Sequence, residues 1–121
     1  MKIVPFLSLL DQLRIFHWQT SSYAEHKALG KSYETLSDLF DRFIEIYYGK
    51  YGKPLVAVDY NIVAESYNSE TDVSKIIGNK KRNLLSYMRN ELVSDNDKDL
   101  LNITDEIEGE LNHLQYLLTL K

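Results

Sequence analysis

Acidic residues recur every three or four positions between residues 34 and 45, as Glu34, Asp38, Asp41 and Glu45. Residues three or four apart share a face of an α-helix, so a helix here would gather these carboxylates into one stripe. Like charges at that spacing repel, and a divalent cation bound between Asp41 and Glu45 would cancel the repulsion. The alternative interpretation is a solvated helix face, where charged side chains usually lie.

Two histidines, His17 and His26, precede this stripe and add imidazole, which together with carboxylate suits divalent transition metals. His26 precedes Asp41 by fifteen residues, and on one helix that separation is about 22 Å along the axis. One chain therefore cannot bring both residues to one ion. Two chains can do so if their equivalent helices pack antiparallel about a twofold axis, which would create two equivalent sites per dimer.

A weaker candidate lies near the end of the chain, where Glu106, Glu110 and His113 follow one another. Glu110 and His113 form a Glu-x-x-His pair, the spacing that di-iron helix bundles use to direct both side chains inward. Such a site needs a second Glu-x-x-His, and no other histidine has a glutamate three residues before it. The alternative is a polar flank beside an apolar stripe. Trp18 and the nine tyrosines are interpreted as mostly core and interface aromatics.

The candidate residues must be positioned by helices, because only two prolines and five glycines interrupt the chain. Apolar residues repeat at intervals of three and four in four separate segments. These segments predict helices at about 4–18, at about 23–49, from a Thr71 or Asp72 cap to the polar turn at 94–97, and through the heptad pattern at 100–118. The periodicity lapses between Gly52 and Ser69, which leaves room for a single short helix.

Four amphipathic helices predict an all-α four-helix bundle made of two hairpins and a longer crossover between the second and third helices. The 121 residues form one predicted domain, without a repeat or a linker. The absence of cysteine excludes disulfides and thiolate metal sites. A net charge of −4 disfavours a nucleic-acid partner, and no apolar run is long enough for a membrane span or a secretory signal. A cytoplasmic protein is expected.

Three stretches of the chain carry a family resemblance. Residues 16–19 read Phe-His-Trp-Gln, residues 23–29 read Tyr-Ala-Glu-His-Lys-Ala-Leu, and residues 33–45 contain the acidic stripe with its Asp-x-x-x-Glu. Together they resemble the ferroxidase segment of the Dps-type ferritins, the starvation-induced DNA-protection proteins, and residues 97–114 look like that family's last helix. The resemblance implies a ferritin-like bundle that assembles as a homo-oligomer through its second helix, either a dimer or a larger shell.

The same resemblance implies a function and a set of ligands. His17 and His26 of one subunit would bind iron together with Asp41 and Glu45 of its twofold partner. Glu34 and Asp38 would draw cations toward the site. The protein would bind Fe(II), oxidise it with peroxide or oxygen, and so store or detoxify iron.

Two departures from the family pattern keep a second hypothesis open. The family has an acidic residue four positions after the second histidine, where this chain has Gly30, and the spacer between His17 and His26 is shorter and lacks a Gly-Pro turn. The second hypothesis is a metal-free bundle that serves as an oligomeric scaffold or a partner-binding protein. DNA compaction is the weakest reading, because residues 80–82 form the only basic cluster.

Overall fold

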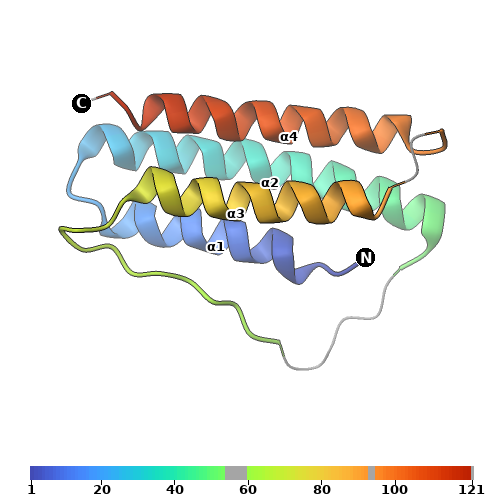
Figure 1. The fold of residues 1–121 in the computed structure, drawn as a ribbon, viewed down its shortest axis with the longest axis horizontal. Coiled ribbons are helices and arrows are strands. Elements are labelled where there is room, and N and C mark those ends of the chain that lie inside the picture. Colours follow the sequence, from blue (N-terminus) through green and yellow to red (C-terminus); the bar gives the residue numbers. More distant parts are fainter. Residues whose placement is uncertain (54–59, 93–94, 121) are drawn as a thin grey trace.

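Regular structure in the computed structural model, which describes residues 1–53, 60–92 and 95–120, is entirely helical (Figure 1). The helices are α1 (Val4–Gln19), α2 (Tyr23–Tyr51), α3 (Val73–Asn90) and α4 (Lys98–Leu117). They lie within three residues of the positions that the apolar periodicity predicts. The prediction of an all-α four-helix bundle is confirmed.

Local side-chain contacts set where the helices begin. Ser22 precedes α2, and its hydroxyl accepts a hydrogen bond from the backbone N–H of Glu25 at 3.2 Å. The Glu25 carboxylate reaches back and accepts from the Thr20 hydroxyl at 2.9 Å. This variant of the capping box closes the short turn between α1 and α2. At the start of α3 the cap is Asp72, whose carboxylate accepts from the Lys75 N–H at 3.0 Å.

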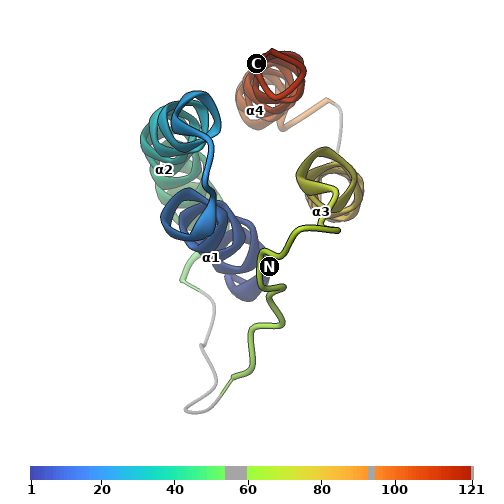
Figure 2. The same ribbon diagram turned by 90° about the vertical axis from the view of Figure 1, so that its left-hand side faces the viewer.

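Each helix packs against two neighbours, in the order α1, α2, α4, α3 around the bundle (Figure 2). Neighbouring helices run antiparallel, so the two helices on each diagonal run in the same direction (Figure 1). The end of α2 and the start of α3 lie at opposite ends of the bundle (Figure 1), and 21 residues separate them, whereas three residues separate α1 from α2 and seven separate α3 from α4. The longer crossover lies between the second and third helices, where the sequence predicts it.

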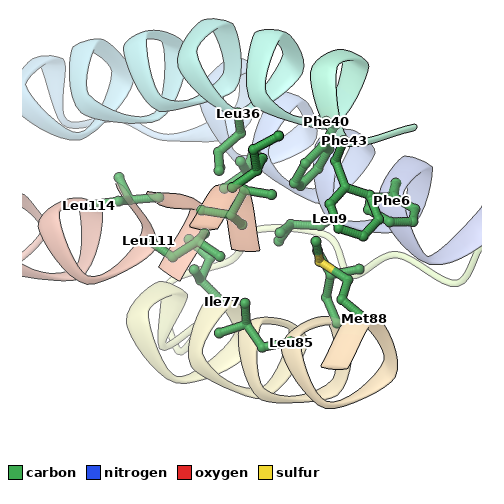
Figure 3. Packing of buried hydrophobic residues seen from close by; sticks show 14 of the residues in the cluster. Phe6, Leu9, Leu36, Phe40, Phe43, Ile77, Leu85, Met88, Leu111 and Leu114 are labelled. Atoms are coloured by element: carbon green, nitrogen blue, oxygen red, sulfur yellow. The ribbon is translucent and has the colours of Figure 1, made fainter. Parts of the chain in front are cut away.

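The core lies between the four helices, each of which contributes side chains to it (Figure 3). Phe6 of α1 presents its ring edge to Phe40 of α2, with ring centroids 5.2 Å apart. Burial of one such side chain contributes about 1.5–3 kcal/mol. Among the described residues, nineteen apolar side chains are buried: Phe6, Leu9, Leu13, Phe16, Leu29, Leu36, Phe40, Phe43, Tyr47, Val73, Ile77, Leu84, Leu85, Met88, Leu100, Ile103, Ile107, Leu111 and Leu114.

The crossover is held against α1 by a buried amide. Gln12 is completely buried, and its side chain donates to the carbonyl oxygen of Glu65 at 2.9 Å and accepts from the N–H of Glu65 at 2.7 Å. A second amide, on Gln19, accepts from the N–H of Tyr67 at 2.6 Å. The sequence leaves room for a short helix between Gly52 and Ser69. Residues 60–69 contain no helix, and residues 54–59 lie outside the described residues.

Among the described residues, no helix combines the length and the apolar character needed to cross a lipid bilayer.

Candidate functional site

The two histidines face each other across the turn between α1 and α2. His17 lies in the last turn of α1 and His26 in the first turn of α2. Their rings stack with centroids 3.8 Å apart and planes 14° from parallel. The Nδ1 of His17 donates to the carbonyl oxygen of His26 at 2.6 Å, and the Nδ1 of His26 donates to the carbonyl oxygen of His17 at 2.7 Å.

These reciprocal bonds determine the tautomer of each ring. A carbonyl oxygen only accepts, so Nδ1 must carry the hydrogen in both rings, and in a neutral ring the lone pair is then on Nε2. Metal-binding histidines commonly have this arrangement, with one ring nitrogen donating to a carbonyl and the other facing the ion. The bond from His26 also satisfies one of the last carbonyl groups of α1, which have no partner within their own helix.

Gly30 lies one turn after His26, at the position where the Dps-type pattern has an acid. A Cβ built at Gly30 would lie 2.7 Å from Cε1 and 2.9 Å from Nδ1 of His17, which is too close for any side chain. Residue 30 must therefore be glycine while the His17 ring stays in this place. Within the described part of the chain, no group of three histidine or acidic side chains that could hold a metal ion forms at this end of the bundle.

The carboxylates predicted as ligands lie elsewhere. Asp41 and Glu45 are exposed on the outward face of α2, as are Glu34 and Asp38. Among the described residues, no three histidine or acidic side chains of one chain come close enough to hold a metal ion together. Since the prediction requires carboxylates from a second copy, it stays a prediction.

The weaker candidate ligands on α4, Glu106, Glu110 and His113, have different surroundings. Glu110 is partly buried and accepts a hydrogen bond from the hydroxyl of Ser32, a buried residue of α2, at 2.9 Å. Glu106 forms an exposed ion pair with Arg42 at 3.6 Å. His113 is exposed. These contacts connect α2 to α4 and give Glu110 a structural role.

Two exposed aromatic residues are neighbours of the histidine pair: Trp18 follows His17 in the sequence, and the ring centroid of Tyr23 lies 6.3 Å from that of His26. The guanidinium carbon of Arg14 lies 3.8 Å from the ring centroid of Tyr33 and 5.8 Å from that of Trp18. Tyr23 is 73 % exposed and Trp18 is 70 % exposed, so Trp18 is not one of the core aromatics. Its place in an interface stays a prediction.

A family model matches residues 17–118, and its description is "Family of unknown function (DUF5856)". The chain belongs to this family. The matched part of the DUF5856 member begins at His17 and includes His26, Asp41 and Glu45. No curated protein and no solved structure matches the chain. Function must therefore be argued from the geometry of these residues.

Sequence reasoning interpreted Gly30 only as a lost ligand and missed its contact with His17. The signal was a glycine inside a strongly periodic helical segment, which often marks a close approach of another group. Sequence reasoning also missed the hydrogen bonds that the backbone carbonyls of His17 and His26 accept. Every residue has a backbone carbonyl, so its role as an acceptor cannot be recognised from residue type.

Proposed function

We propose that the chain is a subunit of a ferritin-like homo-oligomer that binds and oxidises Fe(II) for iron storage or detoxification. Iron is the substrate. Its ligands are His17 and His26 of one subunit and Asp41 and Glu45 of a second subunit, whose α2 packs antiparallel to the first.

The observation that carries this proposal is the reciprocal pair of Nδ1–carbonyl bonds between His17 and His26. It holds two stacked imidazoles in the tautomer that carries hydrogen on Nδ1 and leaves each Nε2 with a lone pair that a metal ion can accept. The exposed carboxylates of Asp41 and Glu45 add support, because within the described part of the chain neither forms an ion pair. Imidazole and carboxylate together are a donor set that accepts Fe(II).

The experiment is an anaerobic Fe(II) titration, followed by addition of oxidant, of the wild-type protein and matched variants. In His26→Asn, the amide nitrogen can take the place of Nδ1 and keep the bond to the His17 carbonyl, while the Nε2 ligand is lost. We expect this variant to fold like the wild type and to lose stoichiometric Fe(II) binding. Asp41→Asn should lose binding as well, and Asp11→Asn, an exposed acid on α1, should retain it.

Mixing two inactive variants tests whether the site lies between subunits. A heterodimer of His26→Asn with Asp41→Asn has one site with both substitutions and one site with neither. We expect the mixture to regain binding, at one intact site per heterodimer. Binding that persists in His26→Asn, or a mixture that stays inactive although the chains exchange, would contradict the proposal.

A second candidate function is the metal-free oligomeric scaffold, which the contact between His17 and Gly30 favours. That contact fills the place of the acid expected one turn after His26 with the His17 ring itself. On this alternative, wild-type protein and all the variants bind no Fe(II), whereas the oligomer forms equally well in the presence of a chelator. Elemental analysis and light scattering on the same sample distinguish the two candidates.

A further inference from the structure

The outward face of α2 carries a continuous stripe of exposed residues that we call the α2 stripe. Its members are Tyr23, Lys27, Lys31, Glu34, Asp38, Asp41, Glu45 and Gly49, all exposed. The charges are segregated, because both lysines lie in the first half of the stripe and three of the four acids lie beyond the middle of the helix. Within the described part of the chain, none of these six charged side chains forms an ion pair.

We propose that the α2 stripe binds the α2 stripe of a second copy of this chain, with the two helices antiparallel and the twofold axis at the level of Leu36 along the helix, midway between Glu34 and Asp38. In this register Lys31 faces the partner's Asp41 and Lys27 faces the partner's Glu45. Twofold symmetry repeats both pairs, so four opposite-charge pairs form in each dimer. Parallel helices would instead place like charges opposite each other.

The spacing of the stripe selects the register. The intervals between successive members are four, four, three, four, three, four and four residues, which read the same in both directions. An antiparallel pair centred on Leu36 therefore places every member opposite another member. Tyr23, which is 73 % exposed, then faces the partner's Gly49, where a Cβ would meet nothing within 4 Å.

One type of pair in this register is unfavourable, occurs twice in each dimer, and gives the proposal a distinctive signature. Near the axis Glu34 faces the partner's Asp38, so like charges meet there. Neutralising Asp38 should strengthen the dimer, whereas neutralising Lys31 should weaken it. Two substitutions on the same exposed face would then act in opposite directions, which a general loss of helix stability does not produce.

The inference rests on the pairing of two copies through α2 that the proposed function also uses, but it does not need a metal. The lysines of one copy neutralise the carboxylates of the other, so we expect the dimer to form in a chelator. Iron would have to displace Lys31 and Lys27 from the carboxylates that it binds.

The test is the dissociation constant of the dimer, measured by analytical ultracentrifugation of the full chain in EDTA. Lys31→Glu should raise the dissociation constant about tenfold, since it turns two attractive pairs per dimer into repulsive ones. Asp41→Lys alone should do the same, and the two together should restore the wild-type value. Asp38→Asn should lower the dissociation constant, and Lys75→Glu, an exposed reversal on α3, should leave it unchanged.

Three results would overturn the inference: a wild-type monomer, a dimer insensitive to Lys31→Glu, or restoration of Lys31→Glu by Glu45→Lys in place of Asp41→Lys. Its failure is distinguishable from failure of the proposed function. A charge-dependent dimer without Fe(II) binding leaves the interface standing and removes the iron role. Stoichiometric Fe(II) binding by a dimer whose dissociation constant does not respond to these charge substitutions supports the iron role and removes the proposed interface.

Discussion

The His17 ring occupies the space that a side chain at Gly30 would need, with 2.7 Å between its Cε1 and the position of a Cβ. The ring is not free to move away, because it is stacked on His26 and bonded to its carbonyl oxygen. The histidine pair and Gly30 therefore act as one structural unit at the turn between α1 and α2. An acid at position 30 and this His17 conformation exclude each other.

Gly30→Ala, compared with Gly109→Ala, should measure the steric cost of a Cβ at position 30 apart from the gain in helix propensity. Replacing glycine by alanine inside a helix ordinarily stabilises it by about 0.5–1 kcal/mol. Gly109 in α4 has open space around it, so Gly109→Ala should show that gain. In Gly30→Ala the gain should be offset by displacement of His17, which leaves this variant about 1–3 kcal/mol less stable than Gly109→Ala. Urea unfolding measures the free energy of unfolding of both variants. Equal values would contradict the contact between Gly30 and His17.

Replacing Glu110 should lower the stability of the fold and leave Fe(II) binding unchanged. Its carboxylate accepts from the Ser32 hydroxyl, and Ser32 is 1 % exposed. Glu110→Ala leaves that hydroxyl without its partner and should lower the free energy of unfolding by about 1–2 kcal/mol. Glu110→Gln retains an acceptor oxygen and should cost less. Loss of Fe(II) binding in the well-folded Glu110→Gln protein would return Glu110 to the list of ligands.

Gln12 should control how tightly the crossover is held. Its amide makes two hydrogen bonds to the backbone of Glu65. Gln12→Ala should lower the free energy of unfolding by about 1–3 kcal/mol and speed hydrogen exchange at the Glu65 amide. Gln19→Ala removes one bond at a more exposed position and should have a smaller effect. Unchanged exchange at Glu65 would show that the amide does not hold the crossover.

The contacts of Lys50 with the start of α4 should make stability depend on pH. Lys50 lies 2.8 Å from the buried Asp97 and 3.1 Å from Asp99. The bond to Asp97 is the main reason that the pKa of Lys50 is raised above its ordinary 10.5, and the bond from Lys50 holds the pKa of Asp99 below its ordinary 3.8. The Lys50 contribution is complete below about pH 10.5 and is lost as pH rises through the raised pKa. The Asp99 contribution is complete above about pH 4 and is lost as pH falls through the lowered pKa.

Urea unfolding of the wild type and Lys50→Met across pH measures this dependence. The difference in unfolding free energy should be constant between about pH 5 and 9 and should shrink toward both extremes. Lys98→Met, an exposed substitution in the first turn of α4, is the control. A difference that grows above pH 10.5 would mean that the charge of Lys50 does not stabilise the fold.

The helices were predictable because their information is local. Apolar repeats located all four, and Asp72, one of the two residues expected to cap the third helix, is the cap of α3. The path of the crossover was not predictable, since Gln12 finds its partner at Glu65, far along the chain. The candidate site falls between these cases. Its residue types could be recognised in the sequence, whereas the contact of His17 with Gly30 depends on how the turn places α1 against α2.

The long connection between α2 and α3 also sets an order of events during synthesis. The pair α1 and α2 leaves the ribosome well before α3 and α4, and at about 5–20 residues per second the delay lasts seconds. During that delay the histidine pair can form, because all its partners lie within residues 17–30. The apolar sides of the first two helices, however, stay uncovered. The nascent hairpin is thus the stage at which this protein is most exposed to aggregation and to premature pairing with another chain.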